Sequence, residues 1–299
     1  MTELVIVGTV ALDDVETPFG KVEGALGGAA TYSAYAASYF TRPGIVAVVG
    51  HDFPQKHLDF LGKRGIDTAG IVKEGKTFRW QGFYEYDMNE AKTLRTELNC
   101  LESFKAELPE DYKNTDYLFL ANIDPVLQLQ VLEQMENPKL TAMDTMNFWI
   151  EHKNKELKET IEKVDMLFIN DAEARQLFKT PNLVKAASKA MDMGPRAVVI
   201  KKGEHGALLF CDDKHFSAPA YPMENIRDPT GAGDSFAGGF MGWMAKTKDL
   251  SERNMRKAVI YGSTIASFNA EGFSLENLKK TKLDDIENRY SFFKEIREF

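Results

Sequence analysis

The chain has 299 residues, 43% hydrophobic and 27% charged, a balance typical of globular proteins and unlike that of disordered chains. Its formal net charge of −8 argues against a dedicated nucleic-acid binder, because phosphate binding needs a basic face. No apolar run approaches the roughly 18 residues that a membrane-spanning helix needs. The two cysteines, Cys100 and Cys211, exclude a disulfide framework. With no basic region before the first apolar stretch, we expect a cytoplasmic protein.

Short apolar runs alternate with longer amphipathic ones along most of the chain. The short runs lack period-two alternation, as expected for strands buried on both faces, and predict strands at 4–8, 45–50, 117–121, 140–144, 166–170, 197–201 and 207–211. Helices are predicted at 29–40, 54–64, 125–135, 151–163, 172–178 and 183–191, and over most of the chain after residue 234. This order predicts an α/β protein, a three-layer α/β/α sandwich with a mainly parallel central sheet.

Two stretches depart from this alternation. Residues 13–26 are polar and contain glycine, and residues 77–98 carry alternating aromatic and β-branched side chains that favour antiparallel strands. A surface hairpin would explain the second stretch, and so would a small β-sheet that covers a site as a lid. Because no repeat or linker is found, we expect a single domain over residues 1–299, with lid segments at about 13–26 and 70–100.

The segment DPTGAGD, from Asp228 to Asp234, precedes a predicted apolar helix. Its small residues are Gly231, Ala232 and Gly233. They leave backbone N–H groups unshielded at a helix N-terminus, where an anion is favoured. A glycine turn with an aspartate cap would explain the turn alone, but it leaves Asp228 and Thr230 unexplained. The alternative is an anion hole followed by a carboxylate base.

This segment resembles the C-terminal signature of the ribokinase-like (PfkB) carbohydrate kinases, Asp-Thr-x-Gly-Ala-Gly-Asp, with Pro229 in place of the threonine. Four further matches follow the family's order along the chain. They are Asp13 after the first strand, the pair Gly27-Gly28 before a helix with Tyr32 where an asparagine is usual, the pair Asn170 and Glu173, and the loop from Lys202 to Gly206. The chain is identified on these matches as a member of that family.

The resemblance implies an ATP- and Mg²⁺-dependent kinase that transfers the γ-phosphoryl group to a hydroxymethyl group of a sugar. Asp234 is the expected base, and a carboxylate of ordinary pKa would be ionised at pH 7 without special tuning. The backbone N–H groups of residues 231–233 would stabilise the transferred charge. The expected acceptor-binding residues are Asp13, Gly27, Gly28, Asn122 and Asp144, the last two because they follow predicted strands.

The resemblance also implies a nucleotide site on the opposite side of the phosphate loop. Its expected residues are Asn170, Glu173, Lys202, Gly203, Gly206, Thr230 and Asn269. Glu173 is the expected magnesium group, acting through water, although a helix start capped by Asn170 would explain the same pair. A monovalent cation is a further candidate cofactor.

Two alternatives to a sugar kinase stay open at this point. A nucleoside acceptor is favoured by Tyr32 and by Phe78, Trp80 and Phe83, which could stack on a base. A non-catalytic nucleotide-binding protein would keep the fold without the reaction. The expected partners are small molecules, with no nucleic acid and no membrane, and an exposed lid edge would favour a homodimer.

Overall fold

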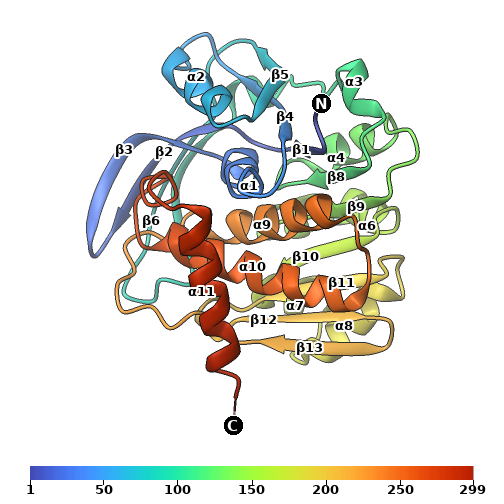
Figure 1. Ribbon diagram of the computed structural model, residues 1–299. Helices are drawn as coiled ribbons and strands as arrows, with labels where there is room; N and C mark the ends of the chain where they lie inside the picture. The colour runs from blue at the N-terminus through green and yellow to red at the C-terminus, as the bar shows by residue number, and fades with distance from the viewer. Residues whose placement is uncertain (299) are drawn as a thin grey trace.

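Nine strands form the central sheet of the computed structural model, which describes residues 1–298 (Figure 1). Their spatial order is β13-β12-β11-β10-β9-β8-β1-β4-β5. Their bounds are β1 Leu4–Val7, β4 Pro43–Val49, β5 Asp67–Lys73, β8 Tyr117–Leu120, β9 Leu140–Met143, β10 Met166–Asn170, β11 Ala197–Lys201, β12 Ala207–Cys211 and β13 Lys214–Ala218. All are parallel to their neighbours except β12 and β13, which confirms the predicted mainly parallel sheet.

Helices cover both faces of this sheet and complete the predicted three-layer sandwich (Figure 1). One face packs against α1 Ala29–Ala37, α2 Gln55–Lys63, α9 Ala232–Thr247, α10 Glu252–Ala270 and α11 Leu283–Glu295. The other packs against α3 Glu110–Lys113, α4 Pro125–Leu132, α5 Asn147–His152, α6 Asn154–Ile161, α7 Asp171–Phe178 and α8 Leu183–Met191. Strand alternation explains the two cores, because Leu4 and Ile6 of β1 enter the first while Val5 and Val7 enter the second.

A separate small sheet has the strand order β3-β2-β6-β7. Its strands are β2 Ala11–Thr17, β3 Gly20–Gly27, β6 Arg79–Phe83 and β7 Lys92–Glu97. The pairs β2–β3 and β6–β7 are antiparallel, which confirms the strands predicted in residues 77–98, whereas β2 and β6 run parallel. The outer strand β7 exposes five of its six residues, whereas β3 exposes three of eight, and dimerisation through such an edge stays a prediction.

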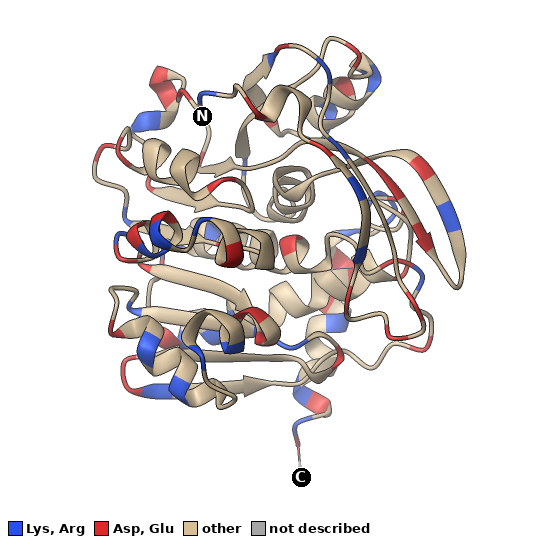
Figure 2. Ribbon diagram, turned by 180° about the vertical axis from the view of Figure 1, so that it is seen from behind, with Lys and Arg blue, Asp and Glu red and all other residues tan. Residues whose placement is uncertain are grey.

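The parallel strands bring their carboxyl ends to one edge of the central sheet. Asn122 and Asp144 follow β8 and β9, while Asn170 and Lys201 end β10 and β11. In open α/β sheets this edge is where ligands bind. Figure 2 shows that the charged residues lie on helices, loops and the small sheet, while the central strands are almost free of them.

Helices α1 and α9 lie against each other beside β1 (Figure 1). A Cβ atom on Gly238 would stand 2.1 Å from the carbonyl oxygen of Ser33, and one on Gly242 would stand 2.7 Å from the Cα of Ala37. Both contacts are shorter than any real Cβ makes, so the glycines permit this approach. Because the two helices pack closely, the N-terminus of α9 lies next to the N-terminus of α1.

The sequence prediction missed the short helix α3 and was wrong at three further elements. Edge strands β5 and β13 were not predicted, because their mixed burial leaves no continuous apolar run. The single helix predicted at 151–163 is two helices, since Lys153 leaves the helical conformation with φ −136° and its ammonium pairs with Asp124. Within residues 1–298, none of the helices combines the length and apolar character needed to cross a membrane.

We predict that Gly238→Ala destabilises the protein by about 1–3 kcal/mol, because the added methyl group forces α1 and α9 apart. Gly62→Ala is the matched control, since nothing lies within 4 Å of the added Cβ in helix α2. There the better helix propensity should stabilise by up to about 1 kcal/mol. Urea unfolding of both variants checks this, and equal effects would contradict the packing argument.

Candidate active site

The segment before α9 is held by its own polar side chains. The buried Asp228 accepts hydrogen bonds from the backbone N–H groups of Thr230, at 2.9 Å, and of Ser274, at 3.3 Å. Asn269, also buried, donates through Nδ2 to the carbonyl oxygen of Thr230 at 2.8 Å. Asp228 therefore shapes the turn, and the amide of Asn269 braces it from α10.

Gly231 turns the chain into α9 with a left-handed φ of +74°. A Cβ atom here would lie 2.3 Å from the ring of Tyr32, so the ring of α1 packs directly on the turn. Tyr32 thereby locks the N-terminal halves of α1 and α9 together. Ala232 and Gly233 follow in the first turn of α9, where backbone N–H groups have no partner within the helix.

Asp13 of β2 is buried beside this helix end and lies over the glycine pair. A Cβ atom on Gly27 would stand 1.8 Å from its Oδ2, and Gly28 takes φ +92° with no room for a side chain against the carbonyl oxygen of Thr9. Burial, together with the negative charges of Asp228 and Asp234, raises the pKa of Asp13 to about 8. The pair Gly27-Gly28 thus makes space for a carboxyl group that faces α9.

Asp234 lies in the first turn of α9, and part of its surface still reaches solvent. Burial raises its pKa to about 7, Asp144 adds to the rise, and the Lys201 ammonium opposes it. The expectation of an ordinary carboxylate was therefore wrong, because the sequence does not show how many protein atoms surround this residue. At neutral pH the carboxyl is divided between its two protonation states.

Lys201 and Asp144 form an ion pair at the carboxyl edge of the sheet. Their side chains are 16% and 3% exposed. Burial lowers the pKa of Lys201, but the charges of Asp144 and Glu173 together raise it by more than burial lowers it. The net shift of the pKa is therefore upward, and the side chain stays a charged ammonium. The carboxylate of Asp144 is thus paired with an ammonium group, and its contact with an acceptor hydroxyl stays a prediction.

Asn170 and Glu173 form a capping box at the start of α7. The Asn170 side chain accepts from the backbone N–H of Glu173 at 2.7 Å, and Glu173 Oε2 accepts from that of Asn170 at 2.8 Å. Burial raises the pKa of Glu173 to about 8 against the attraction of Lys201. Among residues 1–298 no group of three His, Cys, Asp or Glu side chains is placed to hold a metal ion. A magnesium ion that keeps most of its waters and binds substrate phosphates needs only one carboxylate such as Glu173.

The remaining predicted residues lie apart from these carboxylates. The amide of Asn122 donates to the Met146 sulfur at 3.2 Å and accepts from Trp149 Nε1 at 2.9 Å, which ties it to the start of α5. Lys202, Gly203 and Gly206 form the turn between β11 and β12, and both glycines have a left-handed φ. A Cβ on Gly206 would meet the carbonyl oxygen of Ala218 at 2.0 Å, which gives this glycine a packing reason.

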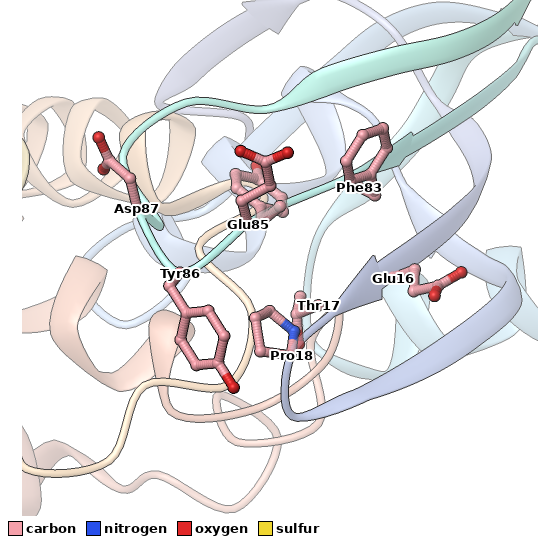
Figure 3. Close-up of a pocket in the computed structure, with 8 residues that line it drawn as sticks. Glu16, Thr17, Pro18, Phe83, Glu85, Tyr86 and Asp87 are labelled. Atoms are coloured by element: carbon pink, nitrogen blue, oxygen red, sulfur yellow. The ribbon is translucent and has the colours of Figure 1, made fainter.

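A groove of about 580 Å³ opens at the end of the small sheet (Figure 3). It is lined by Glu16, Thr17, Pro18, Phe83, Tyr84, Glu85, Tyr86 and Asp87. Three of these are acidic, a poor lining for nucleotide phosphates. Tyr84 lines this groove and also contacts the turn before α9. Its hydroxyl accepts a hydrogen bond from Thr230 Oγ1 at 3.2 Å, which joins the small sheet to that turn.

Two residues that lie at the candidate site, Lys201 and Tyr84, were not identified from the sequence. Lys201 ends β11, and its position after four apolar residues at a strand's carboxyl end was an available signal. Tyr84 follows β6 and carried no signal, because its contact with Thr230 spans 146 positions.

Comparisons with solved structures show the class of fold. The nucleoside kinase of Methanocaldococcus jannaschii, described as an archaeal member of the ribokinase family, superposes with a TM-score of 0.79 at 22% identity, covering 97% of this chain and 99% of that one. Ribokinase from Thermotoga maritima gives 0.76 at 18% identity, with 97% and 100% covered. The fold is ribokinase-like.

The chain belongs to the pfkB family of carbohydrate kinases, because residues 1–281 match the sequence model of that family. A curated cytidine kinase from Thermococcus kodakarensis is 30% identical over 262 residues, covering 84% of this chain and 92% of the relative. A curated nucleoside kinase from M. jannaschii is 25% identical, covering 76% and 72%. The chain is a phosphotransferase that acts on a hydroxyl group of a sugar or a nucleoside.

We predict that Asp13→Asn makes the protein more stable at pH 8.5 but not at pH 3. The pKa of Asp13 is raised from 3.8 to about 8, so its contribution is fully present only below the unfolded pKa and is lost progressively as pH rises to about 8. Asparagine cannot ionise and avoids that loss, worth at least about 1 kcal/mol.

Thermal unfolding at both pH values checks this prediction. Asp14→Asn is the control, because it makes the same change at the neighbouring side chain, which is half-buried and accepts from the Gly24 backbone N–H. An equal melting temperature of Asp13→Asn and the native protein at pH 8.5 would contradict the raised pKa.

Proposed function

We propose that this chain transfers the γ-phosphoryl group of ATP to the hydroxymethyl group of a nucleoside. The observation that carries the proposal is the placement of two carboxyl groups at the N-terminus of α9, the buried Asp13 and the partly exposed Asp234, close enough for the charge of Asp234 to raise the pKa of Asp13. One can hold an acceptor and the other can take its proton, beside backbone N–H groups suited to an anion.

In this proposal Asp234 accepts the proton of the acceptor hydroxyl. The N–H groups of Gly231, Ala232 and Gly233 stabilise the negative charge that spreads over the phosphoryl oxygens. The aspartate and the N–H groups belong to one rigid helix turn, so neither needs to reorganise during transfer. The raised pKa of Asp234 places it near the optimum for a base at neutral pH.

Asp13 recognises adjacent hydroxyls of the acceptor. A buried carboxylate that loses a hydroxyl partner is costly, so this position discriminates against acceptors that lack one. Trp80 is the register partner of Asp13 on the parallel strand β6, and both side chains therefore stand on the same face of the small sheet. The Trp80 ring lies across Gly82, where a Cβ would be 2.3 Å away, and offers a flat surface next to the carboxyl.

A nucleoside is favoured over a free sugar by the relatives. The three with the widest coverage here are a cytidine kinase and two nucleoside kinases, covering 76–86% of this chain. The ribokinase from Bacillus subtilis matches over 38%. A base can stack on an aromatic ring such as Trp80. A sugar acceptor, the first expectation from the sequence, is the second candidate, and the non-catalytic alternative is opposed by the family membership.

The nucleotide lies, in this proposal, along Lys202, Gly203, Gly206 and Asn170, with Thr230 next to the phosphates. Glu173 would hold magnesium through water, and the ion, when bound, would neutralise phosphate charge. Asn269 acts indirectly, by bracing the phosphate turn. The small sheet serves as the lid, and Tyr84 links it to Thr230 in the closed arrangement.

We predict rapid ADP release from MgATP with at least one ribonucleoside in a panel of cytidine, uridine, adenosine, guanosine, 2′-deoxycytidine, ribose and fructose. Asp234→Asn should lower kcat by about 10²- to 10⁴-fold, because the base is lost. Asp14→Asn should keep the native rate. Replacing potassium by a large organic cation in the same assay tests the monovalent-cation requirement.

Turnover of a free sugar alone would replace the nucleoside by the second candidate. A native rate in Asp234→Asn, with unchanged folding, would refute the base. ATP binding without turnover of any acceptor would favour the non-catalytic alternative.

A further inference from the structure

We propose that the Lys201 ammonium binds the phosphoryl group during its transfer, and that Asp144 is a positioning residue that holds the ammonium in place. The inference rests on the proposed function and assigns a catalytic residue that the sequence motifs do not contain. It also gives Asp144 a role different from the predicted contact with the acceptor.

The position of Lys201 carries the first step. Its Nζ lies 3.3 Å from the point where a Cβ on Gly233 would be, so the ammonium stands beside the first turn of α9. A positive side chain is normally unfavourable at a helix N-terminus, whose own partial charge is positive. Two positive groups converging on one space favour a negatively charged occupant, and a phosphoryl group is the anion that the proposed reaction brings there.

Unused hydrogen-bond donors carry the second step. An ammonium has three N–H donors, and within the described part of the chain the hydrogen bonds of Lys201 Nζ end at Asp144 Oδ2. Two donors remain for another acceptor, and the 16% exposure of the side chain leaves them accessible. The Asp144 side chain follows β9 and is almost fully buried. Its ion pair therefore holds the Lys201 ammonium in one place and leaves the other two N–H donors free for a ligand.

The charges around the site carry the third step. Asp144, Glu173 and Asp234 all act on Lys201 and keep it protonated. The ionised Asp144, and Asp234 when it is ionised, would repel an incoming phosphate if no cation stood beside them. Lys201 offsets this repulsion at the point where the phosphate, the proposed base and the proposed magnesium group meet.

The assigned role leaves the balance of the reaction unchanged. A bond forms between the acceptor oxygen and the γ-phosphorus, and the bond from that phosphorus to the oxygen bridging to ADP breaks. The hydroxyl proton passes to Asp234, and ADP leaves with the electron pair of the broken bond. Lys201 keeps its protons throughout and contributes hydrogen bonds and charge.

The test compares Lys201→Met with the native enzyme. We expect kcat to fall about 10²- to 10³-fold, as when one donor to a developing oxyanion is removed, with little change in KM for the nucleoside. Without acceptor, the affinity for a non-hydrolysable ATP analogue should fall about tenfold more than the affinity for ADP, because the lost contact belongs to the γ-phosphoryl group. Lys201→Arg keeps the charge and should retain part of the rate.

A double variant, Lys201→Met with Asp144→Asn, separates this role from a structural one. The single variant leaves Asp144 buried without a partner and can fail to fold, whereas the double variant removes both charges. If Lys201 only neutralises Asp144, the double variant regains the native rate, and the proposal is overturned. It is also overturned if the ratio of ATP-analogue to ADP affinity stays unchanged. That ratio needs no acceptor, so it remains readable even if the proposed nucleoside reaction fails.

Discussion

Gathering several carboxyl groups at one point is the constraint on which the rest of this structure depends. Asp13, Asp144, Glu173 and Asp234 lie near the N-terminus of α9 with the ammonium of Lys201 among them. A carboxylate withdrawn from water without a partner is costly, and the structure offsets this cost in two ways. Asp144 is paired with the ammonium, while Asp13, Glu173 and Asp234 bear raised pKa values and are protonated over part of the neutral range.

The fold supplies this gathering through two independent devices. The parallel strands deliver Asp144 and Lys201 to the same edge of the central sheet. Close packing of α1 on α9, which Gly238 and Gly242 permit, delivers Asp234 from the opposite direction, and Tyr32 seals the contact over Gly231. The geometry of the proposed site is thus set by backbone elements of the core, which suits a reaction that depends on positioning and electrostatics.

Local pattern explains how much the sequence could predict. The continuous apolar runs of β1, β8 and β10 indicated a parallel sheet, and the turn from Asp228 to Asp234 indicated an anion-binding helix start. Contacts between distant residues were out of reach. The ion pair between Asp144 and Lys201 joins residues 57 positions apart, so it depends on how the strands are arranged in the sheet. The pKa of Asp234 depends on its burial, which no short motif records.

The pH dependence of kcat/KM for an acceptor that turns over tests the central claim most directly, because that constant reports ionisations of the free enzyme. If Asp234 and Asp13 must both be ionised and carry pKa values of about 7 and about 8, kcat/KM should rise with pH throughout this range and fall steeply below pH 7. A profile that is flat from pH 5 to pH 9 would mean that both carboxyl groups titrate as ordinary exposed ones, and it would contradict the account.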